Sequence, residues 1–473
     1  MYRAVFVLLT FLFLFGCSQP RVAQQLRPDQ LDFPPLEFHF PQVITQELDN
    51  GMKLYLKEDH ELPLVEMTLL VGGGSILDPL EKTGLSELFA EALATGGAGE
   101  LSAAELEAEL EGRASELSVT SSAYAYEIHL SLHRQDLKRG FEILCDLLRR
   151  PRFEAERLEL ARKQLLESIH RKNDDPGSIA RRLLSEAIYP QHPFGSVPEV
   201  AAVNSFSRAD LIELHERYFH PNNVWMAVSG AVEQAELMAL LQRLLADWQP
   251  VQLPDMQLPE LPPAPLGRVF IVDKAVPQTS IMMGHAGISK DNPDLLPLQV
   301  ANYILGGGGF NSRMMREVRS NRGLAYSVYS YFQVGRHLPG MFIAASETKC
   351  GSTSEVVSLM RELMQQMVDE QVSVAELALA KQSLINSFVF AFNDTHSVVS
   401  RNLRLDFYAY PERYLETYRE KIAAVTVADV QRVAQQYLRP EQLQIVLVGT
   451  SADFAEDVEA FGLPLERVPL KVH

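Results

Sequence analysis

The chain has 473 residues, of which 47% are hydrophobic and 22% charged, a composition typical of globular proteins and not of disordered chains. Its length allows two or three domains with substantial cores. The 61 acidic residues outnumber the 43 basic ones and give a net charge of −18, which argues against nucleic acid as a partner because an acidic surface repels phosphates.

A cleaved secretion signal is predicted at the start of the chain. The apolar run Ala4–Phe15 is short for a membrane-spanning helix and has the layout of a signal peptide. The run ends in Leu14-Phe15-Gly16-Cys17, which resembles a bacterial lipobox and implies lipidation of Cys17. Ser18, directly after this cysteine, resembles the residue that sorts bacterial lipoproteins to the outer membrane. We therefore expect residues 1–17 to be a lipoprotein signal peptide with its lipobox. The protein would then be an outer-membrane lipoprotein facing the periplasm. The alternative is an ordinary signal with a chance cysteine.

Two proline-rich stretches divide the rest of the chain. Residues 18–41 contain five prolines, which favour an extended tether between a lipid anchor and the folded body. Residues 249–267 contain six prolines, a density that excludes a regular helix or a central strand. We interpret this second stretch as a linker between an N-terminal domain, residues 42–248, and a C-terminal domain, residues 268–473.

The two domains contain an internal repeat. Residues 207–230 align without gaps with residues 426–449, at a constant offset of 219. Each copy starts with Ser or Thr and has an acid three residues later, close to a capping box, followed by an amphipathic helix, a proline turn and a strand. Residues 62–73 and 275–287 are predicted to be equivalent strands upstream. The pattern predicts an α+β fold of two homologous domains from a duplication, each a mainly antiparallel sheet packed with helices.

Two pairs of histidines suggest a metal site, but their spacing argues against one. His215 and His220 are five residues apart, which separates them by roughly 140° around a helix, whereas H-E-x-x-H places its histidines four apart on one face. His129 and His133 share one face of a predicted strand, but no third ligand accompanies them. A cross-strand or solvated role is expected for this second pair.

Two carboxylates share one face of a helix predicted within residues 83–97. Glu87 and Glu91 are spaced i, i+4, so a metal site, acid–base chemistry and a solvated face are all open interpretations. The surrounding residues resemble the metal-site region of the insulinase/pitrilysin-type zinc metallopeptidases, a family that includes the processing peptidases. The matching residues are Gly74-Ser75, Asp78-Pro79 and Lys82–Ser86.

The resemblance also identifies the positions of the zinc ligands, and these positions are altered. In the family's H-x-x-E-H motif, Glu87 stands at the first His, Ala90 at the catalytic Glu and Glu91 at the second His. The third ligand, a Glu from a later helix, corresponds to Ser168, with Glu167 one residue out of register. Zinc in such a site requires neutral imidazoles, and the reaction requires a base, so we expect no zinc in this chain and no peptidase activity on its own. The alternative is that the two glutamates bind Ca²⁺ or Mg²⁺.

A second motif is intact. Residues 310–332 closely resemble the family's C-terminal signature, which ends in R-x-x-x-G-L-A-Y. The resemblance implies that Arg319 and Tyr326 reach the substrate at a zinc site. The arginine can hold peptide carbonyls or a carboxylate, and the tyrosine hydroxyl can donate to the oxyanion. Arg322 is a nearby alternative. The structural alternative is an exposed arginine at a helix end and a tyrosine in the core.

Two smaller features remain open. The glycine run before this signature, with Gly307, Gly308 and Gly309, is predicted to be either a flexible turn after a helix or a substrate-proximal loop that another backbone approaches closely. Cys145 lies in an apolar helical pattern and is predicted to be a core residue. Cys145 and Cys350 could pair in an oxidising compartment, but nothing in the sequence places them together.

The loss of one motif and the retention of the other lead to a functional hypothesis. Some bacterial relatives work as pairs of chains, one with an intact H-x-x-E-H and one that keeps only the Arg/Tyr pair. The chain resembles the second kind, so we expect a homologous partner that holds the zinc, a peptide substrate and a membrane anchor at Cys17. The alternative is a non-enzymatic scaffold or peptide-binding lipoprotein of the same fold. Homodimers and heterodimers both remain open.

Overall fold

The computed structural model describes residues 38–470. The predicted signal peptide, its lipidation site Cys17 and most of the predicted tether 18–41 therefore lie outside the described residues. The chain divides into two units, Met1–His39 and Phe40–His473. Within residues 38–470, the structure has no helix of the length and apolar character that a membrane span requires.

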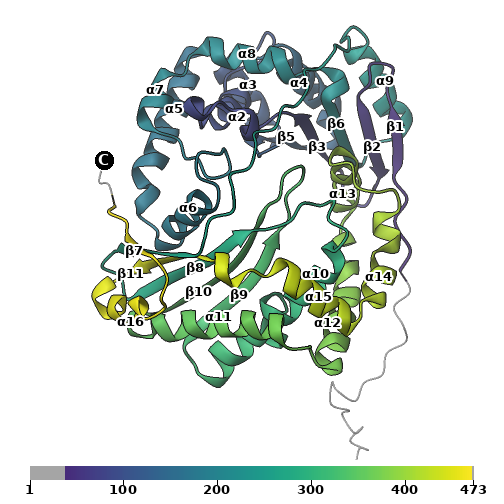
Figure 1. Cartoon of the computed structure of the whole chain (residues 1–473). Helices are drawn as coiled ribbons and strands as arrows, with labels where there is room; N and C mark the ends of the chain where they lie inside the picture. Colours follow the sequence, from purple (N-terminus) through teal and green to yellow (C-terminus); the bar gives the residue numbers. More distant parts are fainter. Residues whose placement is uncertain (1–37, 471–473) are drawn as a thin grey trace, which may run out of the picture. The chain divides into compact units, whose positions relative to one another are not determined.

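Each half of the chain builds a six-stranded sheet covered by helices (Figure 1). The strand orders are β1-β2-β6-β3-β5-β4 and β12-β7-β11-β8-β10-β9. All neighbours are antiparallel except β2–β6, β11–β7 and β12–β7, so the predicted α+β fold with two mainly antiparallel sheets is confirmed. The strands are β1 (Ile44–Glu47), β2 (Lys53–Glu58), β3 (Leu64–Gly72), β4 (Glu116–Ser121), β5 (Ala125–His133), β6 (Val224–Gly230), β7 (Arg268–Asp273), β8 (Gln278–Ala286), β9 (Ala325–Gln333), β10 (Met341–Lys349), β11 (Gln444–Gly449) and β12 (Leu465–Arg467).

The helices repeat between the halves as the sequence predicts. Ser207 and Thr426 each form a capping box with the acid three residues later, and each box starts a helix of 11 residues that leads through a short proline turn into a strand. The helices are α2 (Leu85–Thr95), α3 (Ala103–Gly112), α4 (Leu137–Arg149), α5 (Ala155–His170), α6 (Pro176–Ile188), α7 (Val200–Ser205), α8 (Arg208–Tyr218), α9 (Gln234–Leu245), α10 (Leu295–Asn302), α11 (Thr353–Asp369), α12 (Val374–Ser387), α13 (Thr395–Phe407), α14 (Tyr414–Ala424), α15 (Val427–Tyr437) and α16 (Ala455–Glu459). Residues 249–267, the predicted linker, contain no helix or strand.

Helix α6 belongs to the N-terminal half of the sequence but packs on the C-terminal sheet (Figure 1). Asp175 caps the helix by accepting from the Ser178 backbone N–H, and Pro176 occupies the first turn, where its missing N–H is not needed. The apolar side chains recur at helical spacing and enter one core cluster with residues of β8, β10 and β11. Those side chains are Ile179, Ala180, Leu183, Leu184 and Ile188.

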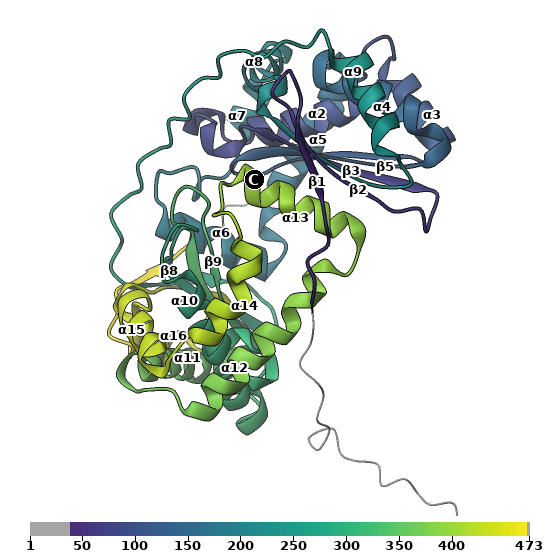
Figure 2. The same cartoon turned by 90° about the vertical axis from the view of Figure 1, so that its right-hand side faces the viewer.

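Helix α13 makes the reciprocal contact: it comes from the C-terminal half and lies against the N-terminal sheet (Figure 2). Val399 and Leu403 pack with Tyr55 and Leu70 in one buried cluster. Because helices then cover both faces of the first sheet, β3 is buried along most of its length instead of alternating. Each half therefore completes the core of the other.

A single carboxylate fixes α13 to the first sheet. Oδ2 of Asp406 accepts three hydrogen bonds, from Lys53 Nζ at 2.8 Å, Tyr55 Oη at 2.7 Å and Trp225 Nε1 at 2.8 Å. The donors come from β2 and β6, neighbouring strands of that sheet. Charge-assisted bonds of this kind are among the stronger ones in proteins, so this residue is a principal polar link between the halves.

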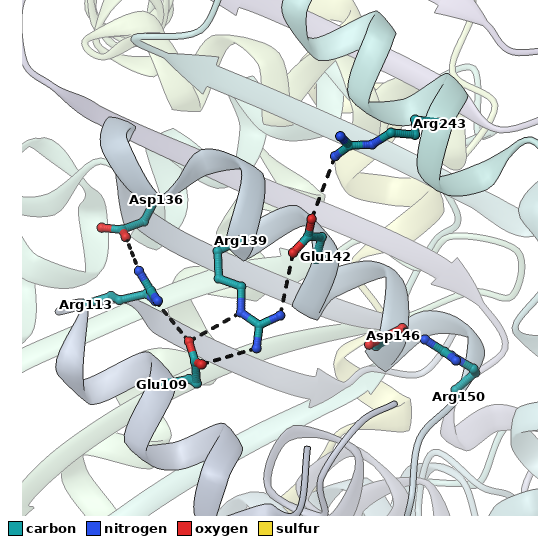
Figure 3. A network of polar contacts seen from close by, with 8 residues as sticks. All are labelled: Glu109, Arg113, Asp136, Arg139, Glu142, Asp146, Arg150 and Arg243. Carbon is teal, nitrogen blue, oxygen red and sulfur yellow. Dashed lines mark hydrogen bonds and ion pairs between the residues drawn. The ribbon is translucent and has the colours of Figure 1, made fainter. Parts of the chain in front are cut away.

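Ion pairs tie the outer helices of the first half together (Figure 3). Glu109 of α3 accepts from Arg113 on its own helix and from Arg139 of α4, and Arg139 also pairs with Glu142. Glu142 also forms an ion pair with Arg243 of α9, whose Nη2 lies 3.8 Å from Glu142 Oε1. Exposed pairs of this type each contribute little, and their value lies in the network.

Candidate functional site

The altered zinc motif lies on α2, as its sequence position predicts. Ala90 is 3% exposed and belongs to the main core cluster of the N-terminal half. Glu91 is half-buried, whereas Glu87 reaches solvent. The protein around Glu87 is nevertheless dense enough that desolvation raises the pKa of its carboxyl above its ordinary value. The position that the sequence resemblance aligns with the family's catalytic base is here occupied by a packed methyl group.

The residues around the motif have structural roles that explain their presence. Asp78 is buried and accepts from the Ser86 backbone N–H at 3.0 Å and from the Ser86 hydroxyl at 2.6 Å, so it caps the first turn of α2 from a distance. Burial raises the pKa of Asp78 to about 6, against the lowering effect of these bonds. Gly84 precedes the helix with φ of 95°, a conformation that favours glycine, and Lys82 pairs with Asp210 at 2.5 Å. These contacts hold the helix in place without any metal.

The residues present do not fit the family's zinc site. The third ligand position, Ser168 on α5, is exposed, and its hydroxyl donates to the Leu165 carbonyl within the same helix. Helix α5 packs against α2, so the scaffold for a ligand set is present. The donors are two glutamates and a serine, with no imidazole, and zinc prefers nitrogen and sulfur ligands. Within residues 38–470, no group of three or more His, Cys, Asp or Glu side chains could hold a metal ion.

Arg319 and Tyr326 are brought together at the surface of the second half. The Arg319 guanidinium carbon lies 4.2 Å from the centre of the Tyr326 ring and 4.6 Å from that of Phe310, so the cation is stacked between two aromatic side chains. Its Nη1 donates to the Tyr326 carbonyl oxygen at 2.8 Å. Tyr326 is 80% exposed and Phe310 66% exposed. The structural alternative, a tyrosine in the core, is therefore wrong.

Arg319 differs from the other arginines of its segment in its electrostatic partners. Arg313 forms a bidentate pair with Glu376, with distances of 2.8 and 3.1 Å. Arg316 lies 3.5 Å from Glu317, and Arg322, the alternative site residue, lies 3.2 Å from Glu355. No carboxylate of the described chain pairs with Arg319. Its stacked guanidinium keeps most of its N–H donors available for a ligand.

The backbone around this pair is irregular. Arg319 lies in a π-helical turn, η9 (Met315–Asn321), and a second one, η7 (Tyr303–Gly307), precedes it. Such turns are rare and are frequent at functional sites. Gly308, one of the predicted loop glycines, lies so close to Tyr303 that a Cβ would come within 2.6 Å of the Tyr303 carbonyl oxygen. The glycine run thus allows a close backbone approach; whether Gly307, Gly308 and Gly309 lie near substrate stays a prediction.

The histidines identified in the sequence have structural partners. His215 Nε2 lies 2.9 Å from the Leu148 carbonyl oxygen, and burial lowers the pKa of His215 to about 4. His129 lies across the sheet from Thr68. Thr68 Oγ1 is 2.8 Å from His396 Nε2 of α13, a contact that the sequence analysis missed because the two residues are 328 positions apart. Cys145 and Cys350 are both buried and free, which confirms the core prediction for Cys145.

The site residues form two separate groups. Glu87, Ala90 and Glu91 lie on α2 in the first half, and α5 with Ser168 packs beside them. Arg319 and Tyr326 lie on η9 and β9 in the second half. Among the described residues, no hydrogen bond or ion pair joins one group to the other. The second group presents a cation and a phenol at the surface of the described chain.

Comparison with known proteins identifies two family domains. The model described as insulinase, peptidase family M16, matches residues 53–197, and the model described as peptidase M16 inactive domain matches residues 205–384. Together they span well over half of the chain. The second model begins before the predicted linker and includes both the linker and the Arg319 segment.

Individual proteins similar to this chain also have names that refer to proteases, to a non-peptidase homolog or to the M16 inactive domain. An uncharacterized zinc protease of Mycobacterium leprae is 27% identical over 312 residues, covering 64% of this chain and 68% of the relative. A non-peptidase homolog, YmxG, of Helicobacter pylori is 24% identical over 410 residues, covering 85% of this chain and 93% of the relative. The crystal structure of a peptidase M16 inactive domain from Pseudomonas fluorescens has a TM-score of 0.77 at 24% identity, covering 86% of this chain and 98% of that one, and supports the fold.

Proposed function

Because the chain belongs to the M16 family of peptidases, we propose that it is the zinc-free subunit of a two-chain metallopeptidase. A homologous partner with an intact H-x-x-E-H would hold the zinc, and this chain would supply Arg319 and Tyr326 to the partner's site. The observation that carries the proposal is the exposed stack of Arg319 and Tyr326, in which the arginine has no carboxylate partner in the described chain. The altered motif on α2 supports the same division of labour between two chains.

The geometry suits recognition of a peptide. Stacking fixes the guanidinium plane between two rings. The donors that are not bound to the Tyr326 carbonyl oxygen stay available for peptide carbonyls or a terminal carboxylate. The exposed Tyr326 hydroxyl can donate to a carbonyl oxygen that gains negative charge as the scissile bond is attacked. Both groups act by positioning and charge stabilisation, so they contribute only when a partner supplies the nucleophile.

We also propose that the protein is a lipoprotein anchored through Cys17 to the outer membrane, where its folded part faces the periplasm. The support is the apolar run and lipobox-like sequence Leu14–Cys17 together with the proline-rich stretch 18–41. Metabolic labelling with a fatty acid, compared between the native chain and Cys17→Ser, tests the anchor. Label retained by the variant would contradict it.

Reconstitution tests the proposed role in catalysis. The chain is mixed with a homologue from the same genome that carries H-x-x-E-H, and cleavage of a pool of fluorogenic peptides is followed. We expect activity from the mixture and not from either chain alone. Arg319→Ala and Tyr326→Phe should each lower kcat/KM by about tenfold or more, because each removes a donor that acts on the substrate.

Neighbouring side chains of the same type provide matched controls. Arg316→Ala removes an exposed arginine that already has a carboxylate partner, and Tyr329→Phe removes a phenol from the same strand. Both controls should retain activity. Full activity of Arg319→Ala and Tyr326→Phe would overturn the catalytic role. A mixture that binds peptide but never cleaves it would favour the non-enzymatic scaffold instead.

A further inference from the structure

A hollow lies where α13 and the start of α14 meet the first sheet and the loop between β9 and β10. Its volume is about 590 Å³, within the range of small-molecule sites. Its walls carry three arginines, Arg336 from the β9–β10 loop and Arg401 and Arg404 from α13, together with three tyrosines, Tyr408, Tyr410 and Tyr414. Neither Arg319 nor the α2 motif contributes to it.

Positive charge in this hollow exceeds negative charge. Arg404 pairs with Glu127 of β5 at 2.5 Å. Arg336 donates to the Tyr410 hydroxyl at 2.5 Å, and its guanidinium carbon lies 4.5 Å from the centre of the Tyr408 ring. Neither Arg336 nor Arg401 has a carboxylate partner within residues 38–470. Two arginines without a carboxylate partner therefore line one hollow of a protein whose net charge is −18.

Two polar atoms in the wall are buried without a partner. The Nε of Arg401 and the Oγ of Ser400 have no hydrogen-bond partner in the described part of the chain. Both residues line the hollow, and the Arg401 guanidinium carbon lies 5.3 Å from the centre of the Phe392 ring. Buried polar atoms are nearly always satisfied in folded proteins, so the two unmet atoms point to a partner, a water or a ligand, that the described chain does not itself supply. An oxygen-rich anion would be such a partner.

The backbone next to the hollow is held in an unusual conformation. Ala409 and Arg413 have φ of 50° and 60°, the left-handed region that residues other than glycine rarely adopt. They flank Tyr410 and precede Tyr414, so the strained loop determines where two of the tyrosines lie. Lys290 donates to the Ala409 carbonyl oxygen at 3.3 Å and holds the loop in place. Strained non-glycine residues of this kind are concentrated at ligand sites.

We propose that this hollow binds a small oxyanion, a carboxylate or phosphate group, through Arg336, Arg401 and Ser400. The planar fork of arginine matches both groups in bidentate geometry. Two uncompensated cations suit a ligand with one or two negative charges, and the tyrosine rings suit a ligand with a small organic body. The site is separate from the Arg319 stack, so it does not depend on the function proposed above.

Titration calorimetry of the full chain tests the site with two probes, inorganic phosphate and succinate, in chloride buffer of constant ionic strength. At least one anion should show saturable one-to-one binding, and the stronger of the two identifies the ligand as a phosphate or a carboxylate. Arg401→Gln should weaken binding about tenfold or more, because a charged donor is lost. The matched control is Arg243→Gln, which removes a half-exposed arginine of α9 and should leave binding unchanged.

Ser400→Ala provides a second, milder variant in case Arg401→Gln does not fold, which circular dichroism will show. It removes only one hydroxyl and should weaken anion binding about threefold or more. The proposal is overturned if neither anion binds the native chain saturably. It is also overturned if folded Arg401→Gln, or Ser400→Ala in its place, binds as the native chain does.

Discussion

The guanidinium carbon of Arg319 lies 4.2 Å from the centre of the Tyr326 ring, and Nη1 of Arg319 donates to the Tyr326 carbonyl oxygen at 2.8 Å. The first contact positions the ring and the second the backbone, so the two residues form one unit. Both contacts use the planar shape of the guanidinium. An ammonium group, which is a point charge, cannot make both and still present donors to a ligand.

Arg319→Lys is therefore expected to behave like Arg319→Ala in the reconstituted peptidase, with kcat/KM lowered about tenfold or more. The matched substitution Arg316→Lys should have little effect, because that exposed side chain makes only a surface ion pair. Steady-state kinetics of the mixture give both values. Retention of full activity by Arg319→Lys would show that charge alone is sufficient and that the stack is not needed.

Ala90→Glu, which restores the residue that relatives use as a base, is expected to destabilise the fold by about 3 kcal/mol, because the new carboxylate would be buried without a partner. Ala94→Glu, one turn further along the same helix at a half-buried position, should cost less than about 1 kcal/mol. Urea denaturation measures both changes. Equal stability of Ala90→Glu and the native chain would mean that the core around α2 accommodates the acid.

Removal of metal ions should leave the purified chain unchanged, since α2 is held by Asp78 and Lys82 and its motif positions carry no imidazole. We expect the same thermal midpoint before and after treatment with EDTA, and no stoichiometric zinc by elemental analysis. Stoichiometric Ca²⁺ or Mg²⁺, lost in Glu87→Gln with Glu91→Gln, would instead support the alternative in which the glutamates are ligands.

Asp406→Ala should lower the free energy of unfolding by about 2 kcal/mol. It removes three hydrogen bonds to one carboxylate and leaves the donors of Tyr55 and Trp225 without their acceptor. Partial exposure of Asp406 limits the loss, because water can replace some of these bonds. Asp247→Ala removes a more exposed ion pair with Arg149 and serves as the control, with a much smaller expected change. Equal effects of the two variants would contradict the role of Asp406 as a link between the halves.

Stability should fall as the pH is lowered from about 6.5 to 4. Burial lowers the pKa of His215, His285 and His396 to about 4 in each case, so in this window the unfolded chain binds protons that the folded chain does not. Each histidine contributes a slope of roughly 1.4 kcal/mol per pH unit. Asp78 has the opposite effect on stability. Its pKa is raised to about 6, so the folded chain binds this proton more tightly than the unfolded chain does. The stability that Asp78 contributes is therefore present at low pH and is lost as the pH rises through about 6.

Urea denaturation at pH 7, 6 and 5 measures this dependence on pH. His396→Gln should reduce the slope by about one histidine's contribution, because it removes one of the three groups whose pKa is lowered by burial. An unchanged slope in His396→Gln would show that His396 takes up its proton in the folded state as readily as in the unfolded state.

Local patterns predicted the fold and the Arg/Tyr pair because their signals are short in sequence. The capping boxes at Ser207 and Thr426 and the strands that follow are each encoded within about 25 residues, and the structure confirms them. The stack of Phe310, Arg319 and Tyr326 likewise lies within one segment. Amphipathic spacing predicts that a helix buries one face, but it does not say against which sheet.

Long-range placement could not be predicted from a single sequence. Nothing local in α13 indicates that it covers the other half's sheet, and its contacts with Thr68 and Tyr55 join residues more than 300 positions apart. The arginines of the hollow beside α13 come from the β9–β10 loop and from α13 itself, which lie far apart in the sequence. The retained residues around the altered motif, such as Asp78, were correctly recognised as similar to the family, but their role in capping α2 required the structure.

The exchange of α6 and α13 has a consequence for how the protein is made. When the first half has emerged from the ribosome, its sheet still has one uncovered face. That face stays uncovered until residues 395–407, which form α13, have left the exit tunnel. The first half can therefore form its main core early, but the face that α13 covers stays available to chaperones or to aggregation until the second half follows. If the gene were cut at the proline-rich linker, each fragment would lack the helix that covers its sheet from the other half. The buried clusters around α6 and α13 would then form only when the two fragments associate.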